Sequence, residues 1–109
     1  MRNDIERLQD ILEAIKRIGE YAGVDRARFD RDELIQTWMV HNIQIIGEAA
    51  SQLSEEFRSQ HPEISWREIS AMRNVIVHAY FRVDPDEVWS AVQDDIPVLR
   101  ERVEEILQS

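Results

Sequence analysis

Apolar residues recur every three to four positions along most of this chain, and that spacing restricts the possible fold more than any other feature. It places the apolar side chains on one face of an α-helix. The composition agrees, because 43% hydrophobic and 32% charged residues with only 3 Gly and 3 Pro are typical of a compact, helix-rich protein. The sequence therefore predicts an all-α fold, a bundle of four to five antiparallel helices with short connections.

Capping residues indicate where the first two helices lie. The first is predicted from about Asn3 to Tyr21, with one apolar stripe made of Ile5, Leu8, Leu12, Ile15 and Ile18. Residues 23–29 are expected to form a polar connection. Asp30 and Glu33 then make a capping box, so the second helix should start there, continue through Leu53 and end before Pro62. Its middle is apolar on more than one face, which predicts neighbours on two sides, and a second chain could supply one of them.

Similar signals predict the third and fourth helices. Ser65, with a glutamate three residues later, opens a helix that should end close to Tyr80. Asp84 and Pro85 supply an N-cap and a proline at the first helical position for the last helix. Pro97 lies inside that helix and should kink it, because proline removes one backbone hydrogen bond.

Length and composition limit the class of protein. A chain of 109 residues fits a single domain, residues 1–109, with one modest core. The absence of cysteine excludes disulfides and thiolate metal sites and favours a reducing cytoplasm. No stretch approaches the roughly 20 apolar residues that cross a bilayer, and residues 1–10 are charged, unlike an export signal. The sequence thus predicts a cytoplasmic protein without a membrane segment.

The formal net charge of −9 weighs against binding nucleic acid irrespective of sequence, because that binding depends on clustered Lys and Arg. Any contact with RNA has to be local. All basic residues except Lys16 are arginine, the side chain best suited to forked hydrogen bonds with phosphate.

Arg73, Asn74 and His78 are the residues most suited to chemistry. Positions 73 and 78 of a regular helix are separated by about 140° around its axis, whereas positions 74 and 78 share a face. A wide turn near the helix end, or pairing between two chains, would bring Arg73 and His78 together. An imidazole that moves a proton and a guanidinium that stabilises a phosphorane suit RNA cleavage without a metal or cofactor. An Arg and a His near a helix end are more often surface groups or partners of the helix dipole, so the spacing alone does not identify an enzyme.

Four further polar residues are candidates for a functional role. Glu48 lies in an apolar stretch, where it could pair with Arg73, orient His78, or occupy a solvated helix edge. Periodicity favours Tyr80 as a half-buried packing residue, with a phenol exposed beside the active site as the alternative. His41 and His61 have no partner at ligand spacing, so no metal site is expected.

Blocks of sequence in a fixed order resemble the HepT-like branch of the HEPN superfamily. They are Ile45-Ile46-Gly47-Glu48-Ala49-Ala50, His61-Pro62-Glu63-Ile64-Ser65-Trp66-Arg67-Glu68-Ile69, Met72-Arg73-Asn74 with His78 and Tyr80-Phe81, Val88-Trp89, and Asp95-Ile96-Pro97-Val98-Leu99. This resemblance implies a HEPN-like bundle that acts as a metal-independent endoribonuclease toxin, paired with a minimal nucleotidyltransferase antitoxin in a type VII system. It also implies a homodimer whose two motifs face one cleft.

The resemblance assigns a role to each residue of the motif. Arg73 and His78 match the catalytic pair of R-x4-H, Asn74 matches the polar residue that often follows the arginine, and Glu48 is expected to support the active site. Tyr80 matches the tyrosine to which the antitoxin transfers AMP, which would add charge and bulk beside the cleft. His41 and Gln44 stand where relatives often have Arg and Glu, which puts a basic RNA contact from the second helix in doubt. The alternative function is a non-catalytic binding partner of a nucleotidyltransferase.

Overall fold

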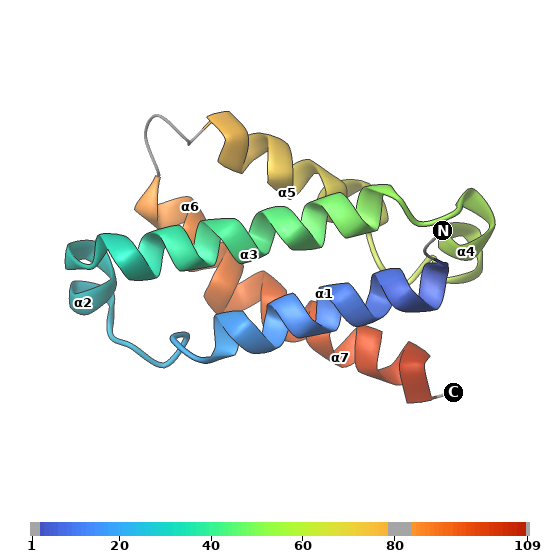
Figure 1. Cartoon of the computed structure of the whole chain (residues 1–109), viewed down its shortest axis with the longest axis horizontal. Coiled ribbons are helices and arrows are strands. Elements are labelled where there is room, and N and C mark those ends of the chain that lie inside the picture. The colour runs from blue at the N-terminus through green and yellow to red at the C-terminus, as the bar shows by residue number, and fades with distance from the viewer. Residues whose placement is uncertain (1–2, 79–83, 109) are drawn as a thin grey trace.

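The computed structural model describes residues 3–78 and 84–108, and the side chains of residues 74–78 lie outside this description. Within it the protein is an elongated antiparallel bundle, 41 × 26 × 24 Å, which confirms the predicted all-α class (Figure 1). Successive long helices run back and forth along the long axis. They are α1 (Asp4–Gly19), α3 (Glu33–Ser51), α5 (Trp66–His78) and a continuous last helix made of α6 (Pro85–Ser90), η1 (Ala91–Asp95) and α7 (Ile96–Gln108).

The connection predicted between the first two helices is itself partly helical, which corrects the sequence-based expectation. α2 (Arg26–Arg31) occupies most of it, because Asp25 caps that helix by accepting a hydrogen bond from the Arg28 backbone N–H at 2.7 Å. Asp30, predicted to open the second long helix, therefore lies inside α2. Asp32 caps α3 instead and accepts from the Ile35 N–H at 3.1 Å.

The second long helix also ends earlier than predicted. α3 ends at Ser51, and a separate short helix, α4 (Glu55–Gln60), follows at the end of the bundle where α1 begins (Figure 1). Ser54 caps α4 with its hydroxyl, and its backbone N–H and Oγ both donate to Asp4 of α1, at 2.8 and 2.6 Å. A polar residue that can cap and at the same time bind a neighbouring helix is favoured at such a break.

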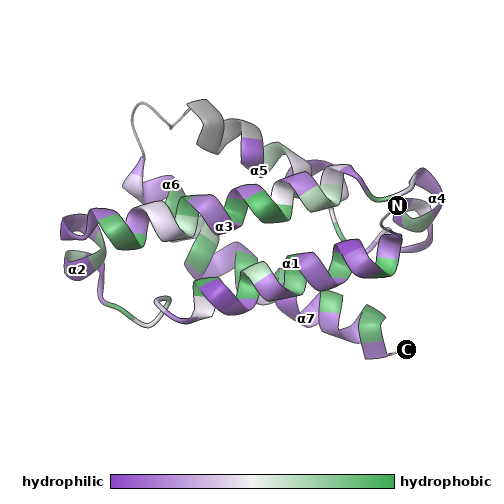
Figure 2. Ribbon diagram, viewed as in Figure 1, coloured by the Kyte–Doolittle hydropathy of each residue, from purple (hydrophilic) through white to green (hydrophobic). Residues whose placement is uncertain are grey.

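The core lies between the long helices, whose apolar sides face inward (Figure 2). α3 packs against both α1 and α5, which confirms that its two-sided apolar pattern meets two neighbours. Trp66 is buried, Trp89 packs against Phe29 with ring centroids 5.3 Å apart, and Trp38 donates from Nε1 to the Arg17 carbonyl at 2.7 Å. The tryptophans therefore act as packing residues.

Pro97 is the second residue of α7, just beyond the π-helical segment η1. In η1, the Ile96 N–H donates to the Ala91 carbonyl five residues earlier. Proline has no N–H and its ring would collide with the carbonyl four residues before it, so a locally wider turn accommodates it without interrupting the helix. Among the helices described, none is both long and apolar enough to span a membrane.

Candidate functional site

Arg73 is held on the side of α5 that faces α3. Its Nη1 donates to Glu48 Oε2 at 2.6 Å and to Ser51 Oγ at 3.0 Å, and both acceptors belong to the last turns of α3. The sequence left three alternatives for Glu48, and pairing with Arg73 is confirmed. The pair is not buried, since 36% of the Arg73 side chain and 57% of the Glu48 side chain are exposed.

Gln52 extends this arrangement by fixing the second oxygen of Glu48. Its Nε2 donates to Glu48 Oε1 at 2.9 Å, one helical turn further along. The hydrogen bond from Gln52 and then that from Arg73 lower the pKa of Glu48 below its usual value, because both stabilise the carboxylate. Glu48 is therefore charged throughout the neutral range and provides Arg73 with a permanently ionised acceptor.

A glycine lets the two helices approach closely at this point. A Cβ atom placed on Gly47 would lie 2.8 Å from the Cβ of Arg73 and 3.2 Å from its backbone nitrogen. Real Cβ atoms are not found at 2.8 Å from another carbon, so any larger residue would push α5 away from α3. Gly47 thus sets the distance from which Arg73 reaches its acceptors.

The Arg73 side chain lines an open groove across the outer face of α3. This groove has a volume of about 420 Å³ and is lined by side chains of three helices: Arg7 and Asp10 of α1, His41, Gln44, Ile45, Glu48 and Ala49 of α3, and Arg73 of α5. Apolar atoms contributed by Ile45 and Ala49 lie among these polar and charged groups. We refer to it below as the Arg73 groove.

Sequence reasoning found only part of this site. It did not single out Ser51, Gln52 or Arg7. Glu48 and Gln52 are four residues apart, and this i, i+4 spacing is a signal from which their hydrogen bond could have been predicted. Arg7 lies 66 positions before Arg73 in the sequence, and no spacing rule brings residues from such distant helices into one groove.

The remaining predicted site residues lie outside the described part of the site. The side chains of Asn74 and His78 are not described, and Tyr80 falls in the undescribed stretch 79–83. The backbone of α5 is α-helical through position 78, so no wide turn brings positions 73 and 78 together. Pairing of Arg73 with His78 between two chains stays a prediction, because the side chain of His78 lies outside the described residues.

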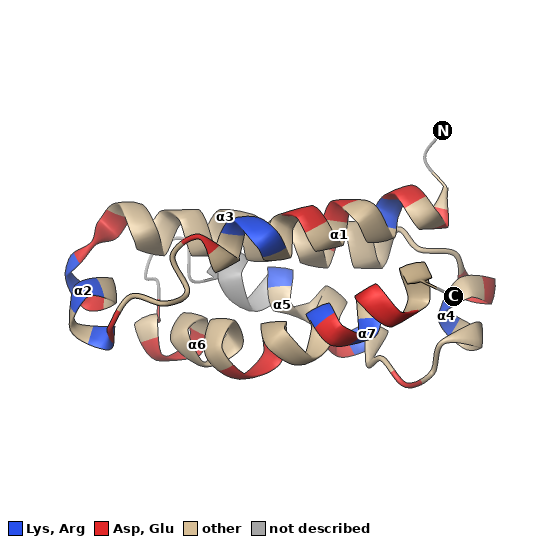
Figure 3. Ribbon diagram, turned by 90° about the horizontal axis from the view of Figure 1, so that it is seen from below, with Lys and Arg blue, Asp and Glu red and all other residues tan. Residues whose placement is uncertain are grey.

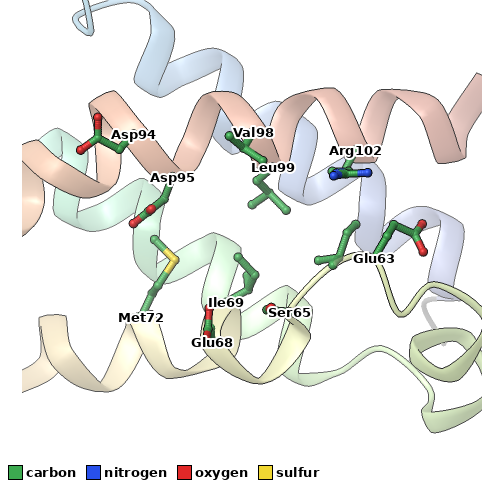
Figure 4. Close-up of a pocket in the computed structure, with 11 residues that line it drawn as sticks. Glu63, Ser65, Glu68, Ile69, Met72, Asp94, Asp95, Val98, Leu99 and Arg102 are labelled. Atoms are coloured by element: carbon green, nitrogen blue, oxygen red, sulfur yellow. The ribbon is translucent and has the colours of Figure 1, made fainter.

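A second hollow, of about 340 Å³, lies between α5 and the last helix and differs in charge (Figure 4). Its floor is apolar, with Ile69, Met72 and Leu99, while its rim carries Glu63, Glu68, Asp94 and Asp95 against the single cation Arg102. Such an excess of carboxylates repels phosphate. Among the described residues, no group of three or more metal-ligating side chains is arranged to hold a metal ion.

Comparisons with known proteins converge on one family. The family model described as Ribonuclease HepT-like matches residues 11–106. A Thermococcus cleftensis protein named "Probable ribonuclease HepT" is 38% identical over 106 residues, which cover 96% of each chain. Proteins named as candidate RNases in Methanocaldococcus jannaschii and Caldanaerobacter subterraneus are 32% and 37% identical, covering 89% and 79% of this chain and 90% and 77% of their own. No solved structure matches the chain.

Proposed function

Since the chain belongs to the HepT-like ribonuclease family, we propose that it is a metal-independent endoribonuclease whose catalytic residues are Arg73 and His78. The observation that carries the proposal is the placement of Arg73, which two α3 side chains hold at the edge of an open groove. The relatives named as ribonucleases support RNA as the substrate.

The proposed reaction uses the RNA itself as the nucleophile. The 2′-oxygen attacks the adjacent phosphorus and the bond from phosphorus to the 5′-oxygen breaks, leaving a 2′,3′-cyclic phosphate. His78 transfers the proton that the 2′-hydroxyl loses, and the leaving 5′-oxygen gains a proton. The guanidinium of Arg73 stabilises the charge that develops on the phosphorane, and Asn74 and Glu48 support the site. DNA is not cleaved, because it lacks the 2′-hydroxyl.

Further proposals concern the proteins that this chain binds. We propose that the protein is the toxin of a type VII toxin–antitoxin pair and acts as a cytoplasmic homodimer in which the two motifs share a cleft. A minimal nucleotidyltransferase antitoxin silences it by transferring AMP to Tyr80. The added phosphate would repel the phosphates of incoming RNA and occupy the space they need.

Expression without the partner tests the nuclease. Wild-type protein is expected to arrest growth and to generate new ends in cellular RNA, whereas His78→Ala does neither. Purified wild type should cleave an RNA oligonucleotide but not its all-deoxy counterpart. Equal growth and intact RNA for both proteins would contradict the nuclease and favour the alternative, a non-catalytic partner of a nucleotidyltransferase.

Mass spectrometry tests the modification. Incubation with the partner nucleotidyltransferase and Mg-ATP is expected to add the mass of AMP to the wild type and to Tyr21→Phe, but not to Tyr80→Phe. Tyr21 is a suitable control because the chain has only two tyrosines. Undiminished modification of Tyr80→Phe would show that the acceptor lies elsewhere.

A further inference from the structure

Arg7 is one of several arginines that form no ion pair among the described residues, and it is the one of them that lines the Arg73 groove. Arg17, Arg26, Arg73 and Arg100 each form an ion pair with a carboxylate. No ion pair joins Arg7 to another residue in ranges 3–78 and 84–108, and its Nε–H is shielded from solvent without an acceptor. A buried donor without a partner is costly, and a bound anion that turns the guanidinium into the groove would satisfy it.

Arg7 and Arg73 lie on opposite walls of the same groove. α3 packs between α1 and α5, and its outer face carries the groove between them (Figure 1). The two arginines therefore approach from two different helices, with Glu48 between them. After the hydrogen bonds from Gln52 and Arg73, the charge of Arg7 is among the influences that lower the pKa of Glu48, so its positive charge acts across the groove.

The carboxylate of Glu48 already has other hydrogen-bond partners in this groove. It is bonded to Arg73 and Gln52. Acidic residues are distributed along the helices, among basic ones (Figure 3). The chain carries 22 acidic and 13 basic residues, whereas this groove carries two arginines against two carboxylates, Asp10 and Glu48. A phosphate matches the forked donors of arginine better than a point charge does.

We propose that Arg7 is a second phosphate-binding residue, which holds a phosphate of the RNA strand next to the one at Arg73. This inference rests on the proposed function and extends it by naming how α1 takes part in binding the substrate. The apolar atoms of Ile45 and Ala49 between the two arginines give a base or ribose a surface to pack on.

Binding can be measured without cleavage in the His78→Ala protein. The probe is a fluorescein-labelled single-stranded RNA of 12 nucleotides, with Kd measured at several salt concentrations. Introducing Arg7→Gln is expected to raise Kd about tenfold at low salt, the loss of one charged hydrogen-bonded contact. The slope of log Kd against log salt should fall by about 0.7, the change for one single-strand phosphate contact.

Two further variants separate a phosphate contact from general effects. Arg7→Lys keeps the charge and should retain most of the salt slope. Lys16→Gln is the matched control, because it removes one positive charge from α1 nine positions away, on the opposite side of the helix, and is expected to change Kd less than twofold. Thermal unfolding of each variant checks that the fold is intact.

The outcomes distinguish this inference from the proposed function. If the parent protein binds RNA and Arg7→Gln behaves like Lys16→Gln, Arg7 is not a phosphate-binding residue and the nuclease proposal stands. If the His78→Ala protein does not bind RNA and the wild type does not cleave it, both are overturned. A phosphate contact would also be contradicted if Arg7→Lys lowered the slope of log Kd against log salt as much as Arg7→Gln does. The positive charge of lysine should preserve that slope.

Discussion

Arg73 depends on neighbours that are themselves held in place, which makes Gln52 the residue whose removal is most informative. Gln52 stabilises the charged form of Glu48, so Gln52→Ala should raise the pKa of Glu48 back toward its usual value. On acidification Glu48 would then become protonated at a higher pH and release Arg73 earlier. The acid limb of the cleavage-rate profile is expected to move to higher pH, and Gln60→Ala, an exposed change on α4, should leave it in place.

The direct substitution of Glu48 separates orientation from stability. Glu48→Gln keeps the shape but removes the charge that fixes Arg73, and we expect RNA cleavage to fall by roughly tenfold or more, because small misplacements of catalytic groups are costly. Since the pair is largely exposed, the free energy of unfolding should change by less than about 1 kcal/mol. Unchanged cleavage at full stability would show that Glu48 does not position Arg73.

For single residues, the sequence indicates candidate site residues more readily than the contacts that their side chains make. The motif residues and the link between Glu48 and Arg73 could be proposed from one chain, because short motifs and apolar context are local signals. Ser51 and Arg7 could not, because their roles arise from the packing of α3 between two other helices. Capping residues gave a similar result, since Asp84 caps α6 as predicted, whereas Asp32 rather than Asp30 caps α3.

Among the helices, the contact between α3 and α5 depends on Gly47. Gly47→Ala introduces a Cβ atom 2.8 Å from that of Arg73, so α5 has to move away from α3. Such overpacking costs about 1–3 kcal/mol of unfolding free energy, and cleavage should fall because Arg73 shifts with its helix. Gly19→Ala is the matched control: no atom lies within 4 Å of its Cβ position, and the exchange should stabilise α1 by up to about 1 kcal/mol. Chemical denaturation of both variants measures the difference, and equal effects would contradict the close approach.

The short helix α4 is tied to α1 through Ser54 and Asp4, and this link should respond to pH. Ser54→Ala removes both the cap of α4 and the hydroxyl bound to Asp4, so unfolding free energy at neutral pH should fall by about 1 kcal/mol. Ser59→Ala, an exposed change within α4, should have little effect.

The sign of the pH effect follows from the pKa of Asp4. The hydroxyl and then the backbone N–H of Ser54 lower it, so the stabilisation is present above the usual Asp pKa and is lost as the pH falls through the lower, folded value. The difference between wild type and Ser54→Ala should therefore narrow in strongly acidic buffer. A difference that stays constant down to that range would show that Asp4 does not contribute to the link.

For the whole molecule, the sequence predicted the class and the antiparallel order of long helices but not the helices at the turns. Apolar periodicity over 13 to 19 residues indicates a long helix regardless of its surroundings. α2 and α4 have six residues each, too few to show a period, and they exist because side-chain caps and contacts with the bundle stabilise them. The π-helical segment before Pro97 is likewise a response of the packed helix to one residue.

The regular geometry of α5 also makes a prediction about the assembly. Because the helix is α-helical across both positions 73 and 78, about 140° separates them within one chain, and we propose that Arg73 of one protomer works with His78 of its partner. Arg73→Ala and His78→Ala should each be inactive alone. A mixed dimer contains one intact pair and one pair that lacks both groups, so after subunit exchange roughly a quarter of wild-type cleavage should return.

Co-expression of the two variants with different tags provides the mixed dimer, and native mass spectrometry can establish its fraction. The matched control pairs Arg73→Ala with the double variant Arg73→Ala/His78→Ala, in which no arrangement of chains restores a pair. Activity in the first mixture and not in the second would place each site between two chains. If the mixed dimer forms at the expected fraction and remains inactive, Arg73 and His78 act within one chain. Binding of RNA must then change the end of α5 to bring the two residues together.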